Sequence, residues 1–185
     1  NYDMANFYAK VVRDWHDSAL PDGMLTDTAP SMGNQYCGVG WAMVHPHLLE
    51  QLYRYYGDRR IVEEQYATAR RWLELVRAQN HDHVIRHGLH DHEALEEEAV
   101  PPMVTPFYCE SARILSRLAR ILGREQEAQE YERLAGAIRS AYVRDFLAAG
   151  TGVVASGIQG AQAFALHLDM LPAEERPPAL AHLIE

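Results

Sequence analysis

The densest group of polar side chains in the sequence is a histidine-rich segment at residues 81–93. Five of the ten histidines lie within residues 81–92, and Asp91 and Glu93 lie at its end. Imidazole and carboxylate groups are ligands for zinc, iron or manganese. The segment has no His-Glu-x-x-His spacing, and His-x-His in a loop is a weak metal signal. We therefore assign no metal ligand and no cofactor, while a metal site and a solvent-exposed loop stay open as alternatives.

A third interpretation of this segment is that its polar side chains hydrogen-bond a neutral sugar. Such a ligand is held by short polar groups that contact its hydroxyls and by aromatic rings that pack on its C–H faces. Side chains of both kinds lie in or beside two long loops of the sequence. The predicted carbohydrate-binding residues are Asp27, Trp41, Asp91, Glu93 and Tyr108.

Asp91 and Glu93 also raise the question of acid–base catalysis on a glycosidic bond. Glycosidases use two carboxyl groups, one with a raised pKa as the acid and one ionised as base or nucleophile. Two side chains only two residues apart share one local environment, which makes it difficult to separate their pKa values. We therefore assign no catalytic residue in this chain.

The overall charge excludes some classes of binding partner. The chain carries a net charge of −9, and every basic residue except Lys10 is arginine. Nucleic acids and anionic membranes both select basic surfaces, so we expect neither as a partner. Two cysteines, Cys37 and Cys109, are too few for a disulfide framework. They leave the compartment open between cytoplasmic and secreted or periplasmic.

Apolar residues recur at steps of three and four along most of the chain, which predicts helices with one buried face. Gly and Pro residues separate these stretches, because neither continues a helix well. The predicted helices are residues 4–19, 41–56, 59–79, 107–122, 125–146 and 159–170, with a seventh that begins near Pro172. Pro46 should kink the second helix unless that helix begins there. The predicted fold class is all-α.

Two of the helix pairs are joined by short glycine turns, at Gly57 and at Gly123. In each pair an aromatic residue, Tyr66 or Tyr131, follows eight or nine residues after the glycine. Repeated helical hairpins without intervening strands predict stacked helix pairs, in an open solenoid or a closed barrel. The two long loops fall at the end opposite to the glycine turns, and this asymmetry favours a barrel with a functional rim.

Several short motifs, taken in order, resemble the six-hairpin domain of bacterial-type α-L-rhamnosidases. The motifs are Asp22–Pro30, Gly40–Trp41, Pro46, Tyr55–Asp58, Gly88–Leu95 and Gln159–Leu166. Many members of that family carry Gly-Asp-Trp where this chain has His90-Asp91-His92, which affects the expected sugar contact. The resemblance spans essentially the whole chain, and it rests on the order and spacing of the motifs together.

The resemblance implies an (α/α)6 barrel of twelve helices. This chain, a partial domain over residues 1–185 truncated at both ends, would supply about seven of them. The implied reaction is removal of a terminal α-L-rhamnose with inversion, which needs an acid and a base with room for water between them. The family's acid motif normally lies before Asn1 and its base beyond Glu185, so the isolated segment should be inactive. Its expected partners are a rhamnosylated substrate, the rest of the parent chain and, through uncovered apolar faces, a second copy.

Two other functions stay open on the sequence alone. A different glycosidase or a sugar lyase could use a similar helical barrel, because fold does not determine function. A non-catalytic helical-repeat protein could use the same hairpins to bind other proteins. That second alternative predicts a regular superhelix, whereas an enzyme predicts long loops gathered at one end of the helix pairs.

Overall fold

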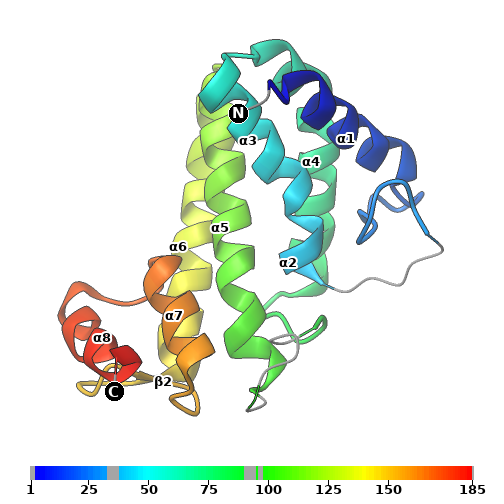
Figure 1. Ribbon diagram of the computed structural model, residues 1–185. Coiled ribbons are helices and arrows are strands. Elements are labelled where there is room, and N and C mark those ends of the chain that lie inside the picture. The colour runs from blue at the N-terminus through cyan, green and yellow to red at the C-terminus, as the bar shows by residue number, and fades with distance from the viewer. Residues whose placement is uncertain (1–2, 33–37, 90–94, 96–97, 185) are drawn as a thin grey trace.

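The computed structural model describes residues 3–32, 38–89, 95 and 98–184. Within these residues the chain is almost entirely helical (Figure 1). The helices are α1 (Ala5–Ser18), α2 (Val39–Ala42), α3 (Val44–Tyr56), α4 (Arg59–Gln79), α5 (Val100–Ile121), α6 (Glu125–Phe146), α7 (Gln159–His167) and α8 (Arg176–Ile184), with a 3-10 turn, η1 (Ala173–Glu175), before α8. Two short strands, β1 (Leu147–Ala148) and β2 (Val153–Val154), pair antiparallel. Seven of the described helices have nine residues or more, which confirms the predicted all-α class.

The helices form antiparallel pairs that follow one another along the chain. Helices α3 and α4 are joined at Gly57, and α5 and α6 at Gly123, where φ is 66° and 75°. Glycine reaches this left-handed conformation without the steric cost that a Cβ would add. Helix α5 lies at the centre and packs against α3, α4, α6 and α7, with α6 running beside it (Figure 1). The prediction of stacked helical hairpins is therefore confirmed.

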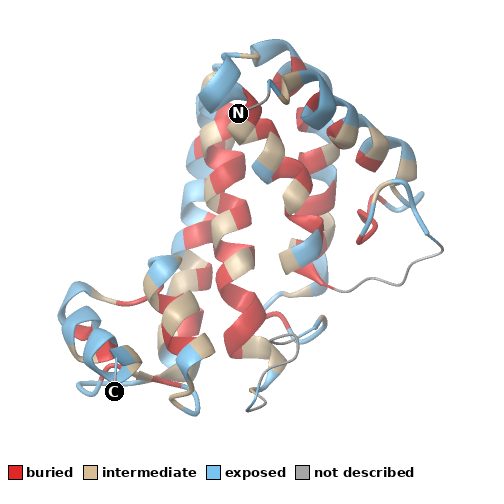
Figure 2. Cartoon of the chain, viewed as in Figure 1, coloured by how far each residue is buried: buried red, intermediate tan, exposed pale blue. Residues whose placement is uncertain are grey.

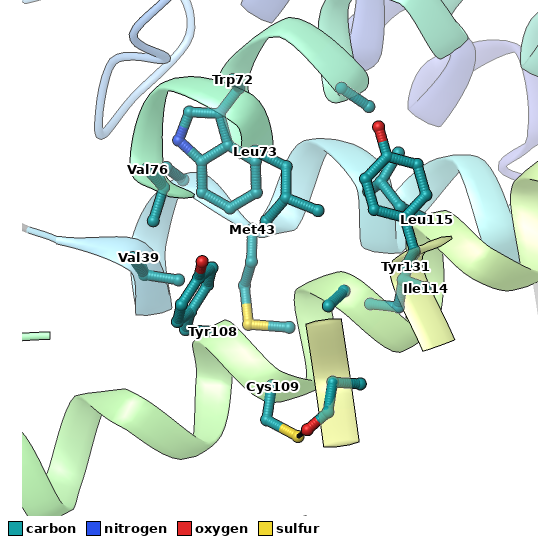
Figure 3. Close-up of a cluster of buried hydrophobic side chains, with 14 of the residues drawn as sticks. Val39, Met43, Trp72, Leu73, Val76, Tyr108, Cys109, Ile114, Leu115 and Tyr131 are labelled. Atoms are coloured by element: carbon teal, nitrogen blue, oxygen red, sulfur yellow. Dashed lines mark hydrogen bonds between the residues drawn. The ribbon is translucent and has the colours of Figure 1, made fainter. Parts of the chain in front are cut away.

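The apolar core lies where α5 meets the helices around it. Buried residues cover most of α5, while α4 and α6 each bury one face and expose the other (Figure 2). Figure 3 shows Trp72 of α4, Tyr108 of α5 and Tyr131 of α6 in one cluster. The thiol of Cys109 donates to the carbonyl of Ala135 at 3.4 Å, and burial raises the pKa of Cys109 to about 11. None of the helices in the described ranges is long and apolar enough to cross a membrane.

The helix predicted around Pro46 is divided into two. Helix α2 ends at Ala42 and α3 begins at Val44, so Pro46 lies in the first turn of α3. In that turn a backbone N–H has no intrahelical acceptor, so a proline loses no hydrogen bond there, and its fixed φ suits the helix. The proline therefore helps to start α3 and does not kink it.

Helix α5 begins earlier than predicted, at Val100 rather than at residue 107. Two prolines occupy its first turn, where proline is tolerated, and Pro106 lies inside the hydrogen-bonded part. Pro106 has no N–H to donate to the carbonyl of Pro102, four residues earlier. The buried hydroxyl of Tyr142 on α6 donates to that carbonyl instead, at 3.1 Å. A side chain from the neighbouring helix thus replaces the missing backbone hydrogen bond.

We expect Tyr142→Phe to lower the free energy of unfolding by about 1–2 kcal/mol, because the buried carbonyl of Pro102 would lose its donor. Urea denaturation followed by circular dichroism measures this loss. Tyr53→Phe is the matched control, because Tyr53 is 38% exposed on α3 and should change stability by less than about 0.5 kcal/mol. Equal losses in the two variants would contradict the role assigned to Tyr142.

The glycine-rich stretch predicted as a turn folds into the β1–β2 hairpin. The carboxylate of Glu175, which is 7% exposed, accepts from the N–H of Gly150 at 2.5 Å and of Gly152 at 2.9 Å. Gln162 on α7 accepts from the N–H of Val154 at 3.0 Å and donates to the carbonyl of Gly152 at 3.1 Å. Strands this short have little stability of their own, so side chains from η1 and α7 hold the hairpin in place.

Candidate functional site

Three long connections, from α1 to α2, from α4 to α5 and from α6 to α7, reach helix ends that lie opposite to the glycine turns: the starts of α2 and α5 and the ends of α4 and α6 (Figure 1). We call them the first, second and third rim loops, at residues 19–38, 80–99 and 147–158, of which the structure describes residues 19–32, 38, 80–89, 95, 98–99 and 147–158. The first two touch through glycines: a Cβ added to Gly38 would lie 2.8 Å from the Cα of Gly88. The second and third are joined by Glu98, which accepts from the N–H of Ser156 at 3.0 Å. The gathering of long loops at one end, expected of an enzyme, is therefore present.

Aromatic side chains lie close to this rim on three helices that pack side by side, α2, α5 and α7. Trp41, predicted to contact a sugar, is 47% exposed. The residue before it, Gly40, lies against the ring of Phe107, which an added Cβ would approach to 3.4 Å. Phe107 packs edge-to-face on Phe164, with ring centroids 5.0 Å apart. An exposed indole and two half-buried phenyl rings can pack against the apolar face of a ligand.

Phe107 and Phe164 were not predicted as site residues. Both stand at helical spacing among apolar neighbours, and such spacing does not distinguish a pocket-lining ring from a core ring. The available signal was Gly40, because a glycine often marks a place where another group approaches the backbone closely.

Of the other predicted sugar ligands, Asp27 and Tyr108 are described and both are buried. Tyr108 is 0% exposed in the cluster of Figure 3, and burial raises its pKa well above the usual range. Asp27 is 5% exposed and follows Thr26, whose carbonyl accepts from the Trp15 indole at 2.7 Å. Helical periodicity explains Tyr108, because it places this side chain on the face of α5 that packs against Trp72. A sugar contact by either side chain stays a prediction.

Asp91 and Glu93 lie outside the described residues, so their assignment stays a prediction as well. In the described part of the same loop, Asp82 and Arg86 form an ion pair at 2.5 Å, and the guanidinium lowers the pKa of Asp82 to about 2. Over the described ranges, no group of three or more His, Cys, Asp or Glu residues is placed to hold a metal ion.

An ion-pair network connects α5 with α3 and with the end of α7. Arg117 on α5 pairs with Glu50 of α3 and, at 2.7 Å, with Glu110 of α5. Arg113, also on α5, lies 3.7 Å from Glu110 and donates to the carbonyl of Leu168 at 2.6 Å, just after α7. A cationic side chain is favourable at the carboxyl end of a helix. The network therefore fixes α3, α5 and α7 relative to one another.

Comparison with known proteins places this arrangement in a family. The model of the bacterial α-L-rhamnosidase six-hairpin glycosidase domain matches residues 1–185. An α-L-rhamnosidase of Streptomyces avermitilis is 28% identical over 98% of this chain, and one of Formosa agariphila is 24% identical over 100% of it. These matches cover 18% and 21% of the two relatives. The chain thus spans about a fifth of the length of these relatives.

Solved structures of α-L-rhamnosidases share the fold. The enzyme from Dictyoglumus thermophilum matches with a TM-score of 0.90 and 26% identity, over 100% of this chain and 22% of its own. The Streptomyces avermitilis enzyme in complex with L-rhamnose matches with a TM-score of 0.87 and 27% identity, over 98% and 18%. The helix pairs are therefore part of an (α/α)6 six-hairpin barrel. The chain belongs to the bacterial α-L-rhamnosidase six-hairpin glycosidase domain family.

Proposed function

We propose that this chain lines the sugar pocket of an α-L-rhamnosidase catalytic domain, and that the parent enzyme removes terminal α-L-rhamnose with inversion. The observation that supports this most is the exposed Trp41 at the loop-bearing end of a six-hairpin barrel, next in sequence to Gly40, which lies against the ring of Phe107. Rhamnose offers C–H faces and a methyl group, and both pack favourably on aromatic rings. A related structure holds L-rhamnose, which supports the same class of substrate.

Polar side chains of the rim would hold the hydroxyl groups of the sugar. We assign Asp91 and Glu93 of the second rim loop to this task, with Asp27 and Tyr108 as further candidates. Ionised carboxylates accept hydrogen bonds from hydroxyl groups and leave the ring oriented. The net charge of −9 suits a neutral substrate better than a polyanionic one.

The catalytic acid and base would come from parts of the parent chain outside residues 1–185. Inverting hydrolysis needs two carboxyl groups roughly 6.5–9.5 Å apart, with a water molecule between the base and the anomeric carbon. The contribution of this segment is then to bind and orient the sugar, which lowers the barrier by removing its freedom to move.

The full-length parent enzyme tests the proposal. We expect it to hydrolyse an aryl α-L-rhamnoside much faster than the corresponding α-mannoside, β-glucoside or uronide. NMR of the sugar released first should show β-L-rhamnose, the product of inversion. Preference for another sugar would replace the proposal with a different glycosidase on the same barrel, and elimination in place of hydrolysis would indicate a lyase.

The isolated 185-residue chain is expected to show no turnover of a chromogenic rhamnoside, because the proposed acid and base lie elsewhere. It should also associate with itself, since aromatic residues such as Phe7 and Tyr55 are 55% and 71% exposed and uncovered apolar surface drives association. Light scattering and a turnover assay on one preparation measure both. Turnover by this chain would contradict the assignment of the catalytic groups to the rest of the parent.

Trp41→Ala in the parent enzyme is expected to raise KM for the rhamnoside by about tenfold, because loss of a stacking ring removes roughly 1–2 kcal/mol of binding. Steady-state kinetics measure this change. Tyr55→Ala is the matched control, because Tyr55 is also exposed but lies in the last turn of α3, at the opposite end. A similar change in KM for both variants would argue against a sugar contact by Trp41.

A further inference from the structure

The second and third rim loops are joined by one carboxylate, that of Glu98. Its Oε2 atom accepts from the backbone N–H of Ser156 at 3.0 Å and from the hydroxyl of the same serine. Its Oε1 atom accepts from the N–H of Ala99 at 2.8 Å, immediately before α5. Glu98 and Ser156 lie 58 residues apart in sequence. The contact therefore ties the third rim loop directly to the start of the central helix.

The backbone around Ser156 is shaped for this contact. Ala155 and Gly157, on either side of it, both have positive φ, at 52° and 81°. Their own N–H groups are hydrogen-bonded to carbonyls at the start and end of the hairpin, each at 2.8 Å. A residue with a Cβ seldom adopts positive φ without a compensating contact. The hydrogen bonds from Ser156 to Glu98 supply such a contact.

The hairpin that precedes Ser156 is fixed independently. The carboxylate of Glu175 accepts from the N–H groups of Gly150 and Gly152, and the side-chain oxygen of Gln162 accepts from the N–H of Val154. These side chains come from η1 and α7, whereas Glu98 reaches the loop from the second rim loop. Loss of the Glu98 contact should therefore leave the hairpin folded and free only the part of the loop around Ser156.

We propose that Glu98 is a positioning residue for the sugar site, which acts through Ser156 to hold the third rim loop in place at the mouth of the pocket. The inference rests on the proposed function, because it takes the rim loops to surround the substrate. In this proposal Glu98 acts through its hydrogen bonds to Ser156 and Ala99. A loop held in one position loses less freedom when the substrate binds, and preorganisation of this kind increases affinity.

The chemistry of the contact requires an ionised carboxylate. Burial raises the pKa of Glu98, but the hydrogen bonds from Ser156 and Ala99 outweigh burial and leave the pKa lowered. Both oxygens of a carboxylate accept, whereas a glutamine amide has one accepting oxygen and one NH₂ group. In Glu98→Gln the side chain keeps nearly the same size, but its NH₂ group faces an N–H donor of Ser156 or of Ala99, so one hydrogen bond is lost.

Kinetics of the full-length parent enzyme test the role in the site. Ser156→Ala and Glu98→Gln are each expected to raise KM for an aryl α-L-rhamnoside about tenfold, the usual size of a lost charged hydrogen bond, with little change in kcat. The effects of the two changes should be less than additive in the double variant, because both weaken the same contact. Ser140→Ala is the control, since Ser140 is exposed on α6 and bonds to Gly136 of its own helix. Unchanged KM in both loop variants would overturn the proposal.

Hydrogen exchange tests the same contact without any substrate. In Ser156→Ala, amides of residues 155–158 should exchange about tenfold faster, while those of β2 and α6 keep their rates. Ser156→Thr keeps both donors and should behave as the wild type in exchange and in KM. Unchanged exchange at residues 155–158 would overturn the positioning role even in a fully active enzyme. Absence of rhamnoside turnover by the wild-type parent would overturn the proposed function instead.

Discussion

Acidification from pH 7 to pH 4 is expected to remove up to about 3 kcal/mol of folding free energy through one side chain, His45. His45 is 0% exposed in α3, and burial lowers its pKa from 6.5 to about 4. The folded chain therefore keeps the ring neutral at pH values where the unfolded chain protonates it. Stability from this residue is complete above pH 6.5 and decreases as the pH falls toward 4. Below pH 4 the folded ring also protonates, and the loss reaches its limit.

The surroundings of His45 explain the direction of the shift. Burial is the largest cause; Gln65 on α4 favours the charged ring, and His16 on α1 opposes it. Neither ring nitrogen has a hydrogen-bond partner of normal geometry within the described residues. A charged imidazolium in this place would lack the solvation that water gives it. The neutral ring is thus the form that the packing of α1, α3 and α4 tolerates.

Urea denaturation at pH 7 and pH 4.5 measures the effect in wild type and in His45→Gln. The wild type should lose more stability on acidification, because glutamine does not titrate. His47→Gln is the matched control, since His47 is exposed on the same helix. Protonation of carboxylates that are paired with arginine, such as Glu64 and Asp82 with pKa values of about 2, also lowers the stability of the fold in acid. Their effect is common to all three proteins, so equal losses in the three would contradict the assignment to His45.

The helices whose ends carry clear chemical signals were predictable from the sequence. Asp58 accepts from the N–H of Ile61 and caps α4, directly after the left-handed Gly57. Arg59–Gln79 and Glu125–Phe146 form at the predicted bounds. In both, an apolar face of period 3.6 runs from one break to the next, so local signals and tertiary packing agree.

The early start of α5 and the β1–β2 hairpin were not predictable, because distant residues determine both. Pro106 predicts a helix break, but Tyr142, 36 residues later in the chain, donates to the carbonyl of Pro102 that Pro106 leaves without a backbone donor. The glycine-rich stretch predicts a turn, and hydrogen bonds to Glu175 stabilise it as a hairpin. Local sequence does not contain the partner in either place.

The candidate site was predictable in part. Trp41, which was predicted from its place beside a long loop, is exposed near the rim, and its contact with a sugar stays a prediction. Tyr108 was predicted to contact the sugar but is buried, because it lies on the face of α5 that packs against α4. The contact between Glu98 and Ser156 joins two loops far apart in the chain. Only the fold brings such pairs together.

Gly152→Ala is expected to lower the free energy of unfolding by about 3 kcal/mol, through backbone strain and overpacking together. Gly152 has a φ of 70°, and an added Cβ would lie 2.3 Å from the backbone nitrogen of Ala179 in α8. That atom belongs to a helix and cannot turn away as a side chain would. Either α8 moves outward, or the hairpin shifts and breaks its hydrogen bonds to Glu175 and Gln162.

Gly150→Ala separates the two causes. Gly150 has a similar φ of 78°, but nothing lies within 4 Å of an added Cβ. Its variant should therefore lose only the cost of the left-handed backbone, about 1 kcal/mol. Urea denaturation of both variants, with hydrogen exchange of residues 176–184, measures the difference. Faster exchange in α8 should accompany Gly152→Ala alone. An equal loss of stability in both variants would contradict the prediction, because close packing on α8 would then not explain the glycine at position 152.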